Sequence, residues 1–99
     1  MLEPLAPDHL TAAMSQLPGW VHEREALTHT WRFADFSTAM TFMQDAAVEI
    51  DRLNHHPEWT NVYNRVSVRL TTHDAGDRVT SKDVELAKVL IWVAQRFMG

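Results

Sequence analysis

The sequence has no cysteine among its 99 residues and only three glycines. Without cysteine, the chain can form no disulfide, thiolate nucleophile or sulfur-ligated metal site. A glycine-rich loop that cradles nucleotide phosphates is not expected from so few glycines, and no Gly-x-Ser-x-Gly nucleophile elbow is present. Any catalysis must therefore use other side chains.

Positive charge is also scarce. Nine Lys and Arg residues against 13 Asp and Glu residues give a net charge of -4 and a pI near 5.8. The basic residues are scattered, so we expect no nucleic acid as a direct ligand. The first ten residues lack a basic region followed by an apolar core, and no uncharged apolar run reaches the length of about 18 residues that spans a bilayer. These absences predict a cytoplasmic protein without membrane contact.

The overall composition is that of a folded domain. Hydrophobic residues make up 45% of the chain and charged residues 22%, as in soluble globular proteins. A chain of this length buries roughly two thirds of its unfolded surface. We therefore predict one domain over residues 1–99.

Hydrophobic spacing predicts six elements before residue 73. A first helix is expected at 8–17, before Pro18 and Gly19, and strands are expected at 20–23 and 27–33, joined by a turn. A long helix at 36–53 follows, opened by the capping residues Asp35 and Ser37. Beyond Pro57, residue types favoured in strands at 58–63 and 66–72 predict a hairpin.

A third helix is predicted at 81–97. Thr80 and Asp83 resemble a capping box at its start, and its apolar residues leave only a narrow polar stripe. Because one small sheet cannot cover so much apolar surface, we expect a homo-oligomer formed through this helix. The element order helix, strand, strand, helix, strand, strand, helix predicts an α+β two-layer sandwich, with three helices on one face of a four-stranded antiparallel sheet.

Six histidines are many for this length, and the second hairpin predicts that some of them meet. If Asn64 and Arg65 form a two-residue turn, His56 lies opposite His73; a three-residue loop that includes Tyr63 places His55 there instead. The parity of His73 on its strand assigns it to the polar face or rim.

Imidazole donates and accepts protons near neutral pH, so this cluster suits general acid/base catalysis. Adjacent histidines seldom direct both rings at one ion, and we expect no metal. From spacing alone, Asp83 can be a helix cap and Asp51 a solvated carboxylate, while Trp59 can be a packing residue or stack on a flat heterocycle.

Several motifs resemble the pterin-4a-carbinolamine dehydratase family, also known as a dimerisation cofactor of a homeodomain transcription factor. They cover about the last two thirds of the chain and comprise Asp35 to Met43 (DFSTAMTFM), His55 to Trp59 (HHPEW), Asn61 to Asn64 (NVYN), Thr71 to His73 (TTH) and Thr80 to Asp83 (T-x-x-D).

The resemblance implies the fold already predicted, assembled as a homodimer or homotetramer. It also implies removal of water from 4a-hydroxytetrahydropterin to give quinonoid dihydropterin, the recycling step after aromatic amino acid hydroxylation, without a metal or organic cofactor. The family's active-site histidines fall on His55, His56 and His73, and its nearby aspartate falls on Asp83. We predict Asp83, Asp51 and Trp59 as substrate-binding or orienting residues.

The chain departs from the family pattern in three places. Asn54 stands where a carboxylate is common, Asp51 stands where a glutamate is frequent, and the loop carrying Asp77 to Val79 is one residue longer than usual. Two other functions stay open: a non-catalytic protein-binding cofactor, and a dehydratase of another pterin-like carbinolamine.

Overall fold

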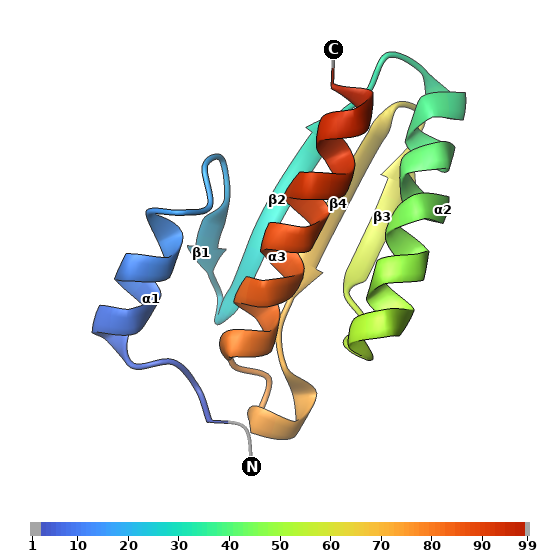
Figure 1. Cartoon of the computed structure of the whole chain (residues 1–99). Coiled ribbons are helices and arrows are strands. Elements are labelled where there is room, and N and C mark those ends of the chain that lie inside the picture. The colour runs from blue at the N-terminus through green and yellow to red at the C-terminus, as the bar shows by residue number, and fades with distance from the viewer. Residues whose placement is uncertain (1–2, 99) are drawn as a thin grey trace.

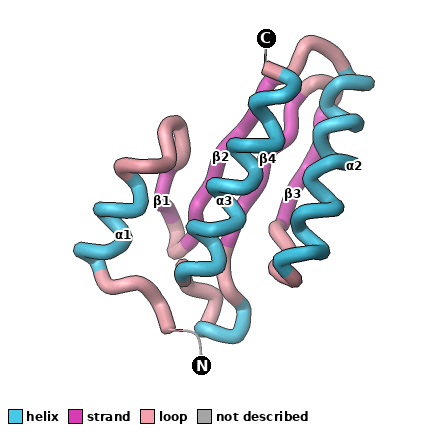
Figure 2. Tube along the Cα trace, viewed as in Figure 1, coloured by secondary structure: helices cyan, strands magenta, loops and turns pink. Residues whose placement is uncertain are grey.

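The computed structural model describes residues 3–98. They form three α-helices and one four-stranded antiparallel sheet, arranged along the chain as α-β-β-α-β-β-α. The strand order across the sheet is β1-β2-β4-β3, so the two hairpins are joined through their second strands. Figure 1 shows this arrangement, and Figure 2 separates the helical layer from the strands. The predicted fold class is confirmed.

The first helix and the first hairpin lie close to their predicted positions. Helix α1 spans Pro7–Met14, and strands β1 and β2 span Val21–Glu23 and Ala26–Arg32. The turn between the strands consists of Arg24 and Glu25, both with positive φ. The prediction that the first helix runs to residue 17 was wrong. The amide of Leu17 bonds to the carbonyl of Met14 three residues back, so the chain tightens into a turn before Pro18.

The second helix, α2, spans Phe36–Leu53 as predicted. Asp35 caps it, because its carboxylate accepts hydrogen bonds from the Thr38 hydroxyl at 2.7 Å and the Thr38 amide at 2.8 Å. These bonds, the hydroxyl bond first, lower the pKa of Asp35 below its ordinary value. Asn54 ends the helix in a left-handed conformation, with φ 51°.

The second hairpin has a different turn from the predicted one. Strands β3 and β4 span Glu58–Val62 and Arg65–Leu70, and Val62 pairs with Arg65. The turn residues are thus Tyr63, with φ 53°, and Asn64. Arg65 is held in the ladder because it also pairs with Arg32 of β2.

This register overturns the predicted pairing of histidines across the hairpin. Glu58 pairs with Arg69, so a ladder continued to His55 would reach Thr72 and not His73. In addition, β4 ends at Leu70, and His73 begins the short 3-10 helix η1, His73–Ala75. The histidines are brought together by the segments that flank the strands, not by strand pairing.

The last helix, α3, spans Ser81–Ala94 and continues as a 3-10 turn, η2, over Gln95–Phe97. The predicted capping box is confirmed: the Thr80 hydroxyl accepts from the Lys82 amide at 3.2 Å, and the Asp83 carboxylate accepts from the Thr80 amide at 2.8 Å.

The hydrophobic core lies between the sheet and the two helices α2 and α3, which cross one face of it (Figure 1). Helix α1 lies beside β1 and buries no residue fully. The largest fully buried apolar side chains come from every layer: Leu17, Leu27, Phe42, Val66, Leu70, Leu86, Leu90 and Val93.

Helix α3 buries most of its apolar side chains within the chain itself. It lies between α1 and α2, and Trp92, at 55% exposure, is the large apolar side chain that it leaves most exposed. Self-association through this helix stays a prediction. Within residues 3–98 no helix combines the length and apolar character needed to cross a membrane.

Candidate functional site

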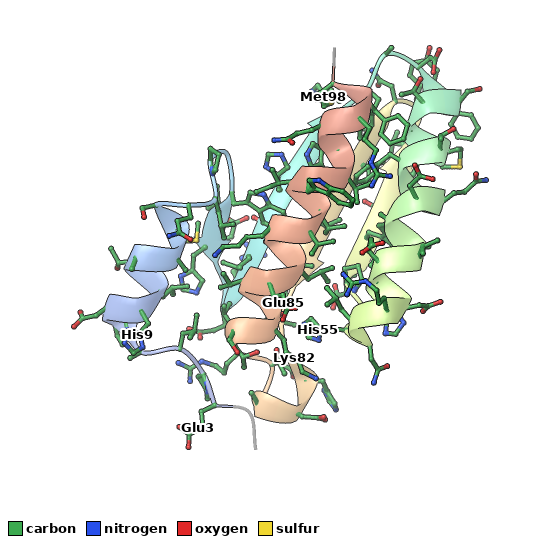
Figure 3. All side chains as sticks on the ribbon, viewed as in Figure 1. Glu3, His9, His55, Lys82, Glu85 and Met98 are labelled. Atoms are coloured by element: carbon green, nitrogen blue, oxygen red, sulfur yellow. The ribbon has the colours of Figure 1, made fainter. Side chains whose placement is uncertain are left out.

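The three histidines line one polar cavity of about 260 Å³. Its walls come from the end of α2, the segment before β3, the segment after β4 and the first turn of α3. The lining residues are Asn54, His55, His56, Thr71, Thr72, His73, Asp74 and Lys82. Figure 3 shows His55 between the end of α2 and the first turn of α3, with Lys82 nearby.

His55 forms the most buried contact of the site. Its Nε2 lies 2.6 Å from Oδ1 of Asp83, with the two side chains 12% and 0% exposed. The left-handed turn at Asn54 reverses the chain after α2 and thereby directs His55 toward the start of α3. The His55–Asp83 contact thus joins the ends of two helices that are 28 residues apart in the sequence.

Asp83 is held by a buried set of donors. Its Oδ2 accepts from the Thr80 amide at 2.8 Å and from the Thr72 hydroxyl at 2.8 Å. Because the Thr72 proton is used there, the Thr80 hydroxyl donates to Thr72 Oγ1, across 2.7 Å. Each donor orients the next, so this network fixes the carboxylate that contacts His55.

His56 is paired with the carboxylate at the end of α2. Its Nε2 lies 3.0 Å from Oδ1 of Asp51, and both side chains are exposed. The pair therefore lies at the wall of the cavity that faces solvent, where an exposed ion pair contributes little to stability. It orients the ring without burying it.

His73 has a carboxylate partner from its own loop. Its Nδ1 lies 3.1 Å from Oδ1 of Asp77, four residues later, and the His73 side chain is 91% exposed. The short helix η1 carries His73 away from the sheet and places it at the rim of the cavity. The prediction that His73 lies on a strand was wrong, because β4 ends at Leu70; its side chain is nevertheless exposed.

Each histidine therefore donates from the nitrogen that contacts its carboxylate, because an ionised carboxylate can only accept. The nitrogens that remain for a substrate are Nδ1 of His55, Nδ1 of His56 and Nε2 of His73. Three imidazoles with defined tautomers around one small cavity can protonate one atom of a ligand and deprotonate another.

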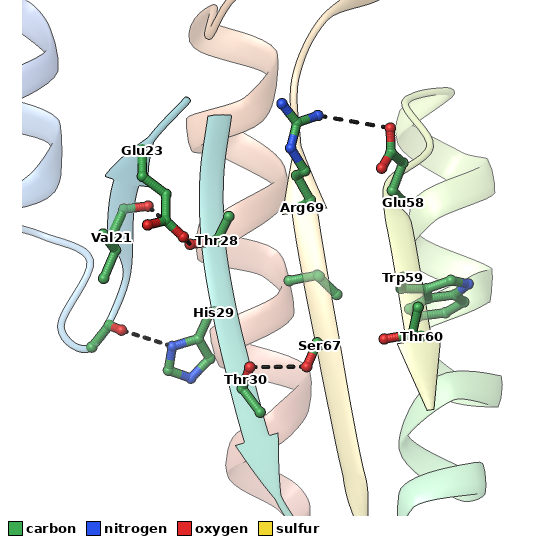
Figure 4. Close-up of a pocket in the computed structure, with 12 residues that line it drawn as sticks. Val21, Glu23, Thr28, His29, Thr30, Glu58, Trp59, Thr60, Ser67 and Arg69 are labelled. Carbon is green, nitrogen blue, oxygen red and sulfur yellow. Dashed lines mark hydrogen bonds and ion pairs between the residues drawn. The ribbon is translucent and has the colours of Figure 1, made fainter. Parts of the chain in front are cut away.

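The structure brings together five of the six predicted site residues. Asp51 and Asp83 touch the cavity histidines directly, whereas Trp59 does not line their cavity. Trp59 is half-buried, packs against the core and lines a wider pocket of about 680 Å³ on the sheet. Figure 4 shows this pocket from the side opposite the helices, with the ion pair of Glu58 and Arg69 at one end of β3 and β4.

Sequence reasoning did not identify the residues that hold the site in place. Thr72 and Thr80 hold Asp83, and Asp77 holds His73. Of the unpredicted residues that line the cavity, Lys82 carries a positive charge. The spacing of four between His73 and Asp77 was a visible signal, since residues this far apart can meet in one helical turn. Thr72 and Asp83 are eleven residues apart and are separated by η1 and the loop before α3, so their contact gave no such signal.

The donor groups of the site do not converge on a common point. Throughout residues 3–98, no group of three or more histidine, aspartate and glutamate side chains is placed to hold a metal ion. The three histidine–carboxylate pairs lie side by side around the cavity as separate pairs.

The fold and site define a small α+β protein whose cavity carries histidine–carboxylate pairs suited to proton transfer. Residues 3–90 match the family model described as pterin 4 alpha carbinolamine dehydratase. The chain belongs to this family. This confirms the resemblance noted in the sequence and the prediction of an enzyme.

Individual relatives agree with this assignment. Proteins named for pterin-4-alpha-carbinolamine dehydratase from Opitutus terrae and Nitrobacter winogradskyi are 61% identical over 75 residues and 43% identical over 101 residues. The first comparison covers 76% of this chain and 77% of the relative, and the second covers 100% and 99%.

A solved structure is also similar to this chain. A crystal structure from Brucella melitensis, described as a transcriptional coactivator/pterin dehydratase, matches with a TM-score of 0.86 and 42% identity. The match covers 93% of this chain and 99% of that one, so the two share their fold over nearly their full lengths.

Proposed function

We propose that this protein dehydrates 4a-hydroxytetrahydropterin to quinonoid dihydropterin by general acid/base catalysis with His55, His56 and His73. Membership of the carbinolamine dehydratase family supports the reaction class. The observation that carries the assignment of residues is the single cavity that all three histidines line, each with its own carboxylate.

The reaction requires two proton movements and one bond cleavage. An imidazolium protonates the 4a-hydroxyl group, the C4a–O bond breaks, and water leaves. A neutral imidazole accepts the proton from N5, and the electron pair of the N–H bond forms the new double bond to C4a. Positioned acid and base groups typically accelerate such steps by about 10² to 10⁴.

The surroundings of the three rings support different roles. His56 and His73 are exposed at the cavity wall and can exchange protons with solvent between turnovers, so we propose them as the groups that handle these two protons. His55 is mostly buried against Asp83 and serves as a second acid or as a contact for the pterin, with its ring oriented by that carboxylate.

The cavity volume also supports a small substrate. At about 260 Å³, it lies just below the roughly 300–1,000 Å³ of typical ligand pockets. Its walls are polar, which suits a bicyclic ring with several amide and amine groups. Kinetics with a series of substrates would identify the physiological one, either a pterin with a particular side chain or another cyclic carbinolamine of similar size.

Stopped-flow kinetics with 4a-hydroxytetrahydropterin test the proposal. We expect His56→Ala and His73→Ala each to lower kcat by at least about tenfold in folded protein, because each removes a proton-transfer group. His9→Ala is the matched control, since His9 is exposed on α1 and lies away from the cavity (Figure 3). If both site variants retain the full rate, histidine catalysis at this cavity is wrong.

A second function is favoured by one comparison. The similar structure from Brucella melitensis is described as a transcriptional coactivator as well as a pterin dehydratase. We propose that self-association as a homodimer or homotetramer, or binding of a helical partner, uses the C-terminal helix α3, where Trp92 is an exposed apolar side chain. A chain that bound a helical partner without accelerating dehydration would establish the binding role in place of the catalytic one. Three further expectations from the sequence stay predictions: that the protein is cytoplasmic, that it forms one domain, and that it needs no cofactor.

A further inference from the structure

We infer that Asp77 is a positioning residue that holds His73 in the tautomer with the proton on Nδ1, so that Nε2 is presented to the substrate. The inference deepens the proposed function and rests on it. Its basis is the distance of 3.1 Å between Nδ1 of His73 and Oδ1 of Asp77. Because the carboxylate can only accept a hydrogen bond, this contact selects one tautomer of the neutral ring.

The loop that carries Asp77 is folded back on Thr72. The amides of Ala75 and Asp77 both bond to the Thr72 carbonyl, at 3.1 Å each, and the Thr72 amide bonds to the carbonyl of Arg78 at 2.9 Å. These backbone bonds close the loop over His73. They also tie it to the residue that donates to Asp83, so the loop is anchored to the buried part of the site.

The backbone conformation at Asp77 suits glycine better than aspartate. Asp77 has φ 59°, directly after Gly76 with φ 76°, and glycine adopts this region without strain. What aspartate adds at this position is its carboxylate. Within residues 3–98, the one hydrogen-bond or ion-pair partner of this carboxylate is His73, whereas the neighbouring Arg78 pairs with Glu25.

His73 depends on this contact because little else restrains its ring. Its side chain is 91% exposed, and its contact with Asp77 is the one side-chain hydrogen bond it makes in the part of the chain that the structure describes. Without the carboxylate, the ring would sample both tautomers and other rotamers. His73 acts here as the base that accepts the N5 proton. A fraction of molecules without the carboxylate would present a protonated nitrogen to N5, where a neutral acceptor is needed.

Two substitutions separate the carboxylate from the backbone. In Asp77→Asn the amide can accept from Nδ1 or donate to it, so the preference for one tautomer is lost. In Asp77→Gly the contact disappears while the left-handed conformation becomes easier. We expect both variants to lower kcat by about two- to fivefold, the scale of an exposed ion pair, with KM unchanged. The midpoint of urea unfolding should stay the same or rise in Asp77→Gly.

Nitrogen-15 NMR of the histidine rings provides a readout that needs no substrate. We expect the wild-type resonances of His73 to show a protonated Nδ1 and an unprotonated Nε2 at a pH where the ring is neutral, and those of Asp77→Asn to show a mixture. Asp45→Asn is the matched control. Asp45 forms a half-exposed ion pair with Arg96 at 3.5 Å and lies about 12 Å along α2 from the end of this helix. The substitution removes the same charge as Asp77→Asn and should change neither kcat nor the His73 resonances.

An unchanged tautomer in Asp77→Asn, or a changed tautomer with the full wild-type kcat, overturns the inference. Failure of the proposed function looks different. In that case the wild-type protein itself does not accelerate dehydration, while the NMR comparison still reports whether Asp77 positions His73.

Discussion

Replacing Thr72 with valine removes one buried hydroxyl group from the site and leaves the shape of the side chain almost unchanged. Thr72 is 3% exposed, and its hydroxyl lies 2.8 Å from Oδ2 of Asp83 and 2.7 Å from the hydroxyl of Thr80. Valine fills the same volume, so the loss of hydrogen bonds is separated from any effect of a cavity.

The cost follows from the two bonds that disappear. The bond to Asp83 is made to a charged group and contributes about 1.5–3 kcal/mol, and the neutral bond from Thr80 contributes about 1 kcal/mol. Thr80 and Asp83 are both fully buried, so water does not replace the lost partner. We therefore expect the free energy of unfolding to fall by about 3 kcal/mol, which lowers Tm by roughly 10–20 °C in a domain of this size.

Urea unfolding followed by circular dichroism measures this difference directly. Thr60→Val is the matched control, because Thr60 is exposed on the open face of β3 and its substitution should change the free energy by less than about 0.5 kcal/mol. Under conditions where both variants are folded, Thr72→Val should also lower kcat, since Asp83 then holds His55 less firmly.

A loss of stability in Thr72→Val no larger than that in Thr60→Val would refute the reasoning. It would mean that the Asp83 carboxylate is satisfied without the Thr72 hydroxyl, and that the buried network is not what fixes His55.

Two further predictions concern the scaffold. Gly19→Ala should destabilise the protein by about 1–3 kcal/mol, because φ at this residue is 84° and the new Cβ would lie 2.9 Å from Cε1 of the His29 ring. Calorimetry would measure the loss of stability, and an unchanged Tm would contradict the prediction. Asp35→Ala should destabilise α2 at neutral pH. The folded pKa of Asp35 is lowered, so the stabilisation is present above its ordinary value of 3.8 and is lost as the pH falls through the folded pKa. Urea midpoints of wild type and Asp35→Ala should therefore converge below about pH 4, and a constant difference would contradict this.

Local signals in the sequence determined the elements and the identity of the site. The spacing of apolar residues and the Asp35 cap located α2 to the residue, and Thr80 with Asp83 located the start of α3. The motifs that resemble the family predicted His55, His56 and His73 as site residues, and the structure places all three at one cavity. Periodicity and capping are local properties, so the sequence alone suffices to predict them.

Tertiary structure alone decided how these residues are held. A shift of one residue in the hairpin turn moved every pair of the β3–β4 ladder, and this register depended on the pairing of Arg65 with Arg32 of another strand. The burial of Asp83 against His55 and Thr72 joins segments up to 28 residues apart. Such contacts depend on how helices and sheet pack together, which no local pattern encodes, and they convert three histidines on the sequence into three oriented imidazoles around one cavity.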